Sequence, residues 1–442
     1  MSSPTTPSAP ADRSAVQVLN DNGAWCWFQD ERALIDPAAN TLLVGSIAAP
    51  EGPGGAQRAG NVELAVHHLA TGETQVVVLH ENLEADDHNA PALWIRPDGR
   101  YLAMYTKHKT DNFTRWRLSA RPHDASEWEA EQVFDWTDLT GGRGATYSNL
   151  HHLSTEGRLY AFARAINDDP SILVSDDHGA TFRYGGKLFT RPKIGYVNGY
   201  TRYASNQADR IDLITTDHHP RDYDNSIYHG YVTGGALHRS DGTVVDPHVL
   251  DASAPSQVEL TTILPTGTTL GGATLTHAWT TDLRQGRADQ SGQLAAVLTA
   301  RAHDEPENTD FTDHRFVYAR YDGATWQTHH LALAGANLLP HEEDYTGLAA
   351  IDPYDLDSLY LSAPVDPRDG SALDQHEIFH GRTGDGGASW TWTPVTENSP
   401  ADNLRPIVAP GDPDTLAVLW FRGSMTASQH YDCEVVAQIA AR

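Results

Sequence analysis

The sequence predicts an all-β protein, and three observations support this fold class. Short runs of β-branched and aromatic residues recur along the 442-residue chain, and turn signals such as residues 97–99 and 240–242 separate them. No window contains a convincing amphipathic helix of about ten residues or more. The expected strands include residues 41–49, 62–70, 74–80, 101–107, 158–165, 211–217, 227–234, 315–322, 358–365 and 415–422.

A repeated turn motif is the third observation, and it indicates how the strands are arranged. Residues 175–182 (SDDHGATF) and 383–390 (TGDGGASW) both fit Ser/Thr-x-Asp-x-Gly-x-Thr/Ser-aromatic, the Asp box, and a weaker echo ends at Trp326. The Asp caps a tight hairpin, the Gly adopts a conformation closed to other residues, and the aromatic packs between sheets. These residues are therefore expected to be structural.

The number of strands favours radial repetition, because open sheets of so many strands curl or split. At about 50–60 residues per four-stranded antiparallel blade, the chain length predicts a seven-bladed β-propeller. We expect residues 16–442 to form this single domain, after a disordered leader at residues 1–15.

The leader, MSSPTTPSAPADRSA, is rich in Ser, Thr and Pro and lacks the apolar core of a signal peptide. It is interpreted as disordered, or as the remnant of a trimmed terminus. Localisation stays open between secretion, if a leader was trimmed, and the cytoplasm. The chain has no run of 18 apolar residues, so no membrane span is predicted.

The charge of the chain limits its partners. The formal net charge is −28, and only four of the 31 basic residues are lysines. A surface this acidic repels nucleic acid and anionic membranes, so neither is expected as a partner. The composition suits concentrated salt, and a high-GC genome would also replace Lys with Arg. To bind an anionic polysaccharide, the protein would need a local cluster of arginines that overcomes the repulsion from its negative net charge.

The two cysteines, Cys26 and Cys433, lie near opposite ends of the chain. In most folds this separation would make a bridge improbable, but a closed ring of blades pairs the first and last strands in one sheet. Pairing, a shared metal and two buried free thiols are the alternatives, with free thiols the expected outcome.

Polar and aromatic residues that could converge on the central channel cluster between residues 84 and 231. Taken singly, each is more often a packing residue than a chemical one, but repetition of His, Tyr and Arg across successive blades is harder to dismiss. The candidates are His88, His108, Tyr147, Arg164, Tyr200, Arg202, Tyr203, His218, His219, Arg221, Tyr228 and His229.

A His/Tyr/Arg set suits β-elimination at a uronic acid. Arginine neutralises the carboxylate so that the adjacent proton becomes removable, and His and Tyr exchange protons once their environment is tuned. Glycoside hydrolysis needs two carboxylates at the right separation. No such pair stands out, although 59 acidic residues leave that reaction open.

Several segments resemble one family of seven-bladed propeller carbohydrate enzymes of the BNR-repeat type. The family includes ulvan lyases and L-rhamnose-α-1,4-D-glucuronate lyases, and the resemblance runs from about residue 20 to about residue 440. The segments are GAWCWFQDERALID, DDHNAPAL, DGRYLAMYTKH, TYSNL, LYAFAR, TDHHPRD, NSIYHGY, EDYTGLAAIDP and DNLRPIV.

The resemblance implies a set of site residues and a reaction. The implied catalytic residues are His88, His108, Tyr147 and Arg164, and the implied substrate-binding residues are Arg221, Tyr200, Arg202 and Tyr228. Arg164, assisted by Arg221, would pair with the glucuronate carboxylate. His88 or Tyr147 would take the C5 proton while the other assists departure of O4, giving a 4,5-unsaturated uronate.

Supporting roles are expected for the neighbours of these residues. His108 would be a second member of the proton relay or would fix the tautomer of His88. Asp86 and Asp87 are expected to cap the loop or hold His88 rather than to do chemistry. Asp217, His218 and His219 look like metal ligands, but consecutive strand residues point to opposite faces, so the three cannot converge without a bend.

The partner expected from the resemblance is an anionic polysaccharide or oligosaccharide that contains rhamnose and glucuronate, bound by a monomer. No cofactor is expected for the chemistry, the resemblance implies a structural Ca²⁺, and metal ligands are not assigned. Two alternatives remain. A rhamnosidase-type hydrolase would need a histidine where this chain has Gln29, and a carbohydrate-binding propeller would need no proton donor or acceptor.

Overall fold

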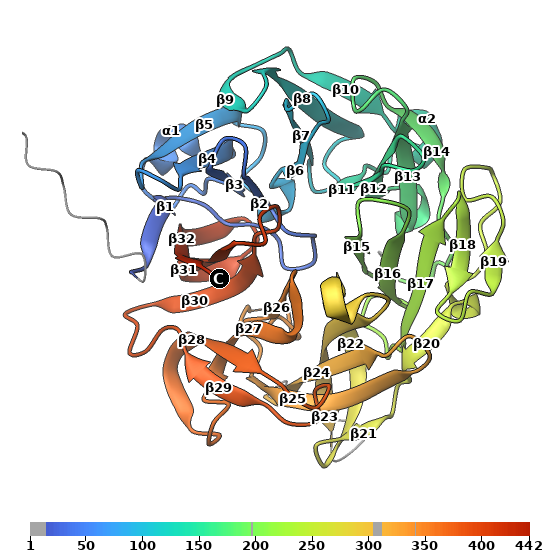
Figure 1. Cartoon of the computed structure of the whole chain (residues 1–442), viewed down its shortest axis with the longest axis vertical. Helices are drawn as coiled ribbons and strands as arrows, with labels where there is room; N and C mark the ends of the chain where they lie inside the picture. Colours follow the sequence, from blue (N-terminus) through green and yellow to red (C-terminus); the bar gives the residue numbers. More distant parts are fainter. Residues whose placement is uncertain (1–14, 196–197, 304–311, 341) are drawn as a thin grey trace, which may run out of the picture.

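The computed structural model describes residues 15–195, 198–303, 312–340 and 342–442. Figure 1 shows seven sheets arranged in a ring, which confirms the predicted all-β seven-bladed propeller. The predicted leader lies almost wholly outside the described residues. Among the described residues, no helix is long and apolar enough to cross a membrane.

The first four blades are built from consecutive antiparallel strands. Blade 1 contains β2 (Ala33–Asp36), β3 (Thr41–Ile47), β4 (Val62–His68) and β5 (Thr74–His80). Blade 2 contains β6 (Ala92–Ile95), β7 (Tyr101–Thr106), β8 (Phe113–Arg121) and β10 (Gln132–Asp135), with β9 (Asp124–Trp128) beside β8. Blade 3 contains β11 (Thr146–Leu153), β12 (Arg158–Arg164), β13 (Pro170–Ser175) and β14 (Arg183–Lys187). Blade 4 contains β15 (Thr201–Ser205), β16 (Ile211–Thr216), β17 (Ile227–Thr233), β18 (Ala236–Arg239) and β19 (Val244–Asp246), with β20 (Thr261–Leu264) paired to β17.

The remaining three blades follow the same pattern. Blade 5 contains β21 (Thr269–Leu270), β22 (Ala273–Gln285), β23 (Leu294–His303), β24 (His314–Tyr321) and β25 (Trp326–Gly335). Blade 6 contains β26 (Ala349–Asp352), β27 (Asp355–Val365), β28 (Ala372–Arg382) and β29 (Thr391–Pro394). Blade 7 contains β30 (Asp402–Val408), β31 (Thr415–Ala427), β32 (His430–Ala441) and β1 (Gln17–Asn20). The short helices are α1 (Gly55–Arg58), α2 (Thr137–Thr140), η1 (Asp87–Asn89), η2 (Ile166–Asp168), η3 (Gln257–Glu259) and η4 (Ala288–Gln290).

Blade 7 closes the ring with strands from both ends of the described chain. Strand β1 pairs antiparallel with β32, with Gln17 opposite Ala437, and the blue and red ribbons lie side by side in Figure 1. The two cysteines do not bond to each other: Cys26 and Cys433 are both buried free thiols, as the sequence favoured.

The Asp boxes form the turns between the third and fourth strands of blades 3 and 6. Asp177 accepts hydrogen bonds from the Thr181 backbone N–H (2.9 Å) and hydroxyl (2.6 Å), and Gly179 has φ 83°. Phe182 then meets Trp116 of blade 2 edge to face, with ring centroids 5.0 Å apart. The motif therefore has the predicted structural role, because its aromatic residue packs one blade against its neighbour.

Residues 24–32, called here the axial segment, fill the space inside the ring. The Trp27 indole N–H donates to the Thr346 carbonyl (2.7 Å), and Phe28 stacks on Trp279 with centroids 4.5 Å apart. Arg405 donates to the Gln29 carbonyl (2.9 Å). The axial segment thus contacts several blades from inside the ring, and the candidate site lies next to it.

Candidate functional site

The candidate site lies on one face of the ring. Because neighbouring strands are antiparallel, the loops that precede each inner strand and those that join the second and third strands emerge at the same end. His88 precedes β6 and His108 follows β7, so the hairpin of these strands returns both residues to that end. Tyr147 begins β11 and Arg164 ends β12 at the same level.

The two predicted histidines form one unit with Asp86. Their rings stack with centroids 3.6 Å apart and planes 9° from parallel. His88 Nδ1 donates to Asp86 Oδ1 (2.8 Å), and His108 Nδ1 donates to Asp86 Oδ2 (3.0 Å). A carboxylate has no proton to give, so Asp86 fixes the hydrogen on Nδ1 of both rings and leaves each Nε2 for other partners.

Local structure explains why His88 is held so firmly. Asp86 is the N-cap of η1 and its side chain accepts from the His88 backbone N–H (3.0 Å). The Gln29 side-chain amide donates to the His88 carbonyl (2.5 Å). His88 itself is buried, with 3% of its surface exposed. Asp86 has the supporting role that the sequence predicted for it, and the Gln29 side chain, which cannot exchange a proton with substrate, positions the loop.

The two histidines differ in protonation although they share one carboxylate. Burial alone would lower the pKa of His88, but its interactions with Cys26 and with the Asp86 carboxylate outweigh burial and hold that pKa well above its ordinary value. Burial, followed by the nearby His88 charge, lowers the pKa of His108 to about 4. At neutral pH the pair therefore carries one positive charge, on the buried ring.

Tyr147 joins this pair to the arginine. Its ring lies over the His88 ring with centroids 5.6 Å apart, and the Arg164 guanidinium carbon lies 4.8 Å from the Tyr147 centroid. Burial raises the pKa of Tyr147 well above its ordinary value, so the phenol is neutral. The residue has φ 67°, a left-handed conformation that costs a bulky side chain about 1–3 kcal/mol and that concentrates at functional sites.

Arg164 is the least satisfied cation of the site. It is buried at 6% exposure, and its Nε and Nη1 atoms have no hydrogen-bond partner among the described residues. Burial disfavours the cation, and at neutral pH, where Tyr147 and Tyr200 are uncharged phenols, Asp168 is a nearby charge that favours it. Its guanidinium also lies 5.3 Å from the Tyr200 centroid. The side chain is charged and sandwiched by aromatic rings without an ion-paired carboxylate.

Tyr200 and Arg221 extend the site toward blades 4 and 6. The Tyr200 hydroxyl lies 3.0 Å from His219 Nε2, and burial raises the pKa of Tyr200 to about 12 and lowers that of His219 to about 3. Arg221 is half-buried and pairs with Glu342 (3.3 Å) and Asp222 (3.2 Å). Tyr200 belongs to the aromatic wall, and Arg221 lies on the rim.

Two predicted substrate-binding residues do not join this group. Arg202 is 1% exposed and forms ion pairs with Glu31 of the axial segment and with Asp282 (2.9 Å). Arg202 lies within β15, two residues after Tyr200 and level with the axial segment, and its charge is already neutralised. Tyr228 packs in a hydrophobic cluster between blades 3 and 4. The arrangement lends no support to a binding role for Arg202 or Tyr228, and that role stays a prediction for both.

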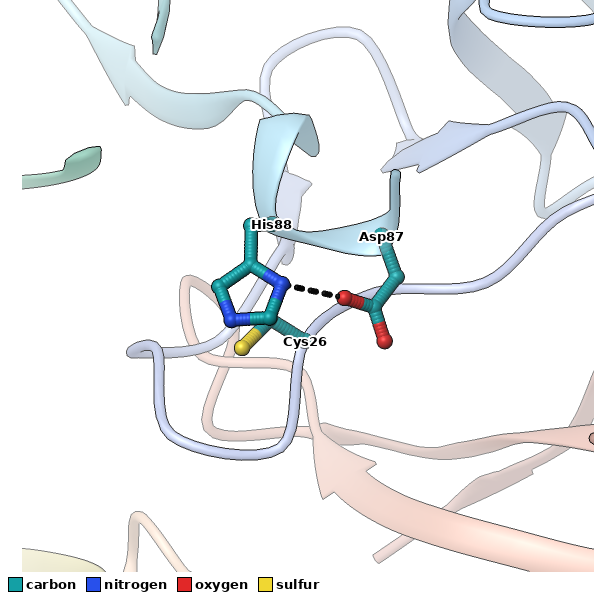
Figure 2. Close-up of side chains that lie close together, drawn as sticks. All are labelled: Cys26, Asp87 and His88. Carbon is teal, nitrogen blue, oxygen red and sulfur yellow. Dashed lines mark ion pairs between the residues drawn. The ribbon is translucent and has the colours of Figure 1, made fainter. Parts of the chain in front are cut away.

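Two groups in the described residues could hold a metal ion: Cys26, Asp87 and His88, and Asp86, His88 and His108. Figure 2 shows His88 between Cys26 and Asp87, with Nδ1 2.7 Å from Asp87 Oδ1. Two ligands of a tetrahedral zinc lie about 3.3 Å apart at bond lengths of about 2.0 Å, so this contact is an ion pair instead. Nitrogen and sulfur donors do not suit Ca²⁺, which takes six to eight oxygens. Neither group supports the structural Ca²⁺, which stays a prediction.

Sequence reasoning missed how the axial segment and the far blades contribute. The Cys26 thiol lies 3.9 Å from the Tyr147 hydroxyl, although the sequence indicated only a disulfide, a shared metal or a buried free thiol for it. Glu342 pairs with Arg221 across the ring. The apolar run WCWF (residues 25–28) was a usable signal for the axial segment, since four apolar residues outside any expected strand need a core of their own. No signal marked Glu342.

Comparisons with known proteins agree with this architecture. A PL25 ulvan lyase, solved bound to -[GlcA(1-4)Rha3S]-, has 14% sequence identity, a TM-score of 0.65 and 96% coverage of both chains. The polysaccharide lyase Uly1 has 12% identity and a TM-score of 0.56, with 96% of this chain and 97% of that chain covered. At these identities the likeness concerns the fold. No curated protein sequence matches the chain. Residues 56–334 match the BNR repeat-containing family, and the chain therefore belongs to that family, as its resemblance indicated.

Proposed function

We propose that the protein is a polysaccharide lyase that cleaves the L-rhamnosyl-α-1,4-D-glucuronate linkage by β-elimination. The observation that carries this proposal is the buried Arg164 cation, unpaired by any described carboxylate, beside two histidines and a tyrosine. The likeness in fold to two polysaccharide lyases supports the same reaction class. The substrate is an anionic polysaccharide or oligosaccharide that contains rhamnose and glucuronate.

Arg164 is suited to a carboxylate. A buried cation without a counterion costs several kcal/mol, and a bound carboxylate would recover much of that cost through charge-assisted hydrogen bonds to Nε and Nη1. Tyr147, Arg164 and Tyr200 line a recess of about 20 Å³. That volume holds about one water, so only the carboxylate would enter, with the sugar ring above it.

The resting protonation states suggest how the protons move. His108 is neutral with Nε2 unprotonated, whereas His88 is charged and Tyr147 is a neutral phenol. We assign removal of the C5 proton to His108 and donation to O4 to His88 or Tyr147. The C5–H electrons then form the C4–C5 double bond as the C4–O4 bond breaks, and O4 leaves protonated as the anomeric hydroxyl of the released rhamnose unit.

Asp86, and not His108, holds the ring of His88 in place, since it accepts from Nδ1 of both rings. Repulsion between the stacked rings limits the pair to one charge, because a second proton would place two cations 3.6 Å apart. This arrangement keeps one acceptor and one donor available at neutral pH.

The test is incubation with gum arabic and with ulvan, followed by ultraviolet absorbance of the unsaturated uronate. Wild-type protein should generate the signal on at least one polymer. Tyr147→Phe and His108→Asn should each lower the rate by about 10²–10⁴-fold while binding persists. Release of rhamnose without absorbance would indicate a hydrolase, and binding without either product would indicate a lectin. Absence of absorbance on both polymers would sink the lyase proposal.

A further inference from the structure

A second cavity lies at the opposite end of the ring from the candidate site. Its walls include residues at or near the ends of inner strands, such as Ile35 of β2, Ile95 of β6 and Ser205 of β15, whereas the candidate site gathers residues where inner strands begin. The axial segment contacts the candidate site at one end and lines this cavity with Asp30 and Glu31, so it lies between the two. We call this space the axial cavity.

The axial cavity has room for a small organic ligand and opens to solvent. Its volume is about 410 Å³, and ligand sites in proteins commonly have volumes of about 300–1,000 Å³. The residues that line it include Gln207, Arg287 and Gly411, which are exposed. A ligand can therefore enter from this face of the ring without passing through the candidate site.

One buried histidine has a nitrogen atom left for a ligand in the axial cavity. His151 is 7% exposed, and its Nε2 lies 2.9 Å from Asp30 Oδ2. A carboxylate has no hydrogen to give, so Nε2 carries the hydrogen and Nδ1 of the neutral ring is an acceptor. Nδ1 has no hydrogen-bond partner among the described residues and is not enclosed by neighbouring atoms, so it faces the cavity that His151 lines.

Aromatic rings form part of the wall of the axial cavity. Trp94 and Tyr354 both line it, and both are half-buried. The Tyr354 hydroxyl accepts from the Gly411 backbone N–H (2.8 Å), which leaves its own hydrogen for another acceptor. Each ring thus offers an apolar surface with a polar group at its edge.

The charged groups inside the axial cavity are already paired within the protein. Glu31 forms an ion pair with Arg284, and Asp30 forms one with His151. Arg287, the remaining charged residue of the lining, is exposed at the rim. A charged ligand would lose its hydration without gaining a free countercharge inside the cavity, so an uncharged ligand is favoured.

We propose that the axial cavity binds a neutral sugar, a monosaccharide or a disaccharide. Sugars combine C–H faces, which pack on aromatic rings, with hydroxyl groups that both donate and accept hydrogen bonds. A sugar hydroxyl would donate to His151 Nδ1 while a C–H face lies against Trp94 or Tyr354. The inference does not depend on the lyase proposal, because none of these three residues takes part in the proposed reaction.

The test is fluorine NMR of protein labelled with 5-fluorotryptophan and titrated separately with L-rhamnose, D-glucose, maltose and D-glucuronate. Trp94 is the only tryptophan among the described residues that line the axial cavity, and Trp94→Phe identifies its resonance. At least one neutral sugar should shift this resonance in a saturable way. His151→Gln keeps a donor for Asp30 but removes the acceptor, and should weaken binding by about threefold to tenfold. Ser205→Trp, which fills the cavity, should abolish binding.

The matched control is His314→Gln. His314 is also buried, and its Nε2 lies 3.0 Å from Asp344 Oδ1, but it does not line the axial cavity. This variant should bind the sugar with wild-type affinity. Shifts at other tryptophans without one at Trp94 would place the sugar elsewhere and overturn the site. The proposal also fails if no neutral sugar causes a shift, if the control weakens binding as much as His151→Gln, or if D-glucuronate binds about tenfold more tightly than every neutral sugar, which would indicate an anion site at Arg287.

Discussion

Replacing Arg164 by methionine should make the free protein more stable and less active. Methionine is of similar length and carries no charge. The change removes a buried cation whose Nε and Nη1 lack partners in the described structure. An unpaired buried ion costs several kcal/mol, and the contacts with the Tyr147 and Tyr200 rings return about 0.5–2 kcal/mol each. We therefore expect the free energy of unfolding to rise by about 1–3 kcal/mol.

Activity should move in the opposite direction. Loss of a desolvated charge pair with the substrate carboxylate costs about 2–5 kcal/mol, which lowers kcat/KM by about 30-fold to 5,000-fold. Urea unfolding followed by tryptophan fluorescence gives the stability, and formation of the unsaturated product gives kcat/KM. The contrast between the two readouts is what distinguishes a binding cation from a structural one.

Arg202→Met is the matched control. Arg202 is equally buried, but its ion pairs with Glu31 and Asp282 are already made. Removing it strands two buried carboxylates and should destabilise the protein by about 3–5 kcal/mol. If Arg164→Met were destabilised to a similar extent and kept its activity, Arg164 would be a structural ion and the central argument for the lyase would fail.

Three further predictions concern protonation and thiols. With His108 as proton acceptor, the acid limb of the pH profile of kcat/KM should lie near pH 4, and a limb near 6.5 would contradict that role. The pKa values of His108 and His219 in the folded protein, about 4 and about 3, lie below the value of about 6.5 expected on unfolding, so the unfolded chain binds more protons. The stability that these two histidines contribute is present above about pH 6.5 and is lost as the pH falls toward 3. Urea unfolding midpoints should therefore be lower at pH 4.5 than at pH 7. His219→Gln should reduce this dependence of stability on pH, and an unaltered dependence would count against the assignment of His219. Neither Cys26 nor Cys433 should react with a thiol reagent in the native protein, and both should react after unfolding without reductant; fewer than two reactive thiols would reveal a disulfide.

Much of the candidate site could be predicted because propeller topology is regular. Once the strands and Asp boxes indicate repeated hairpins, residues that precede an inner strand and residues that follow the second strand must meet on one face. His88 and His108 meet for that reason, although 20 positions separate them. Tyr147 and Arg164 bracket the corresponding hairpin of the next blade and arrive at the same level.

The predicted site residues that lie apart from this group show what the sequence could not supply, which is the depth of a residue along its strand and the contents of the interior of the ring. Tyr200 and Arg202 are two residues apart, yet Tyr200 contacts His219 in the aromatic wall and Arg202 pairs with Glu31 inside the ring. The sequence gives no position for the axial segment, so it could not show that Arg202 already had partners. The sequence also could not show the position of Tyr228, because strand pairing places this residue in the packing between blades.

The axial segment also changes how this ring can unfold. In an open array of repeats each unit contacts only its neighbours, and stability is close to a sum of local parts. Here Trp27 and Gln29 bond to residues 319 and 376 positions away, so blades far apart share one hub. Contacts of such long range slow folding, because they form only after most of the chain has collapsed. Loss of any one blade would expose the aromatic hub, which makes the ring a single cooperative unit rather than seven semi-independent ones.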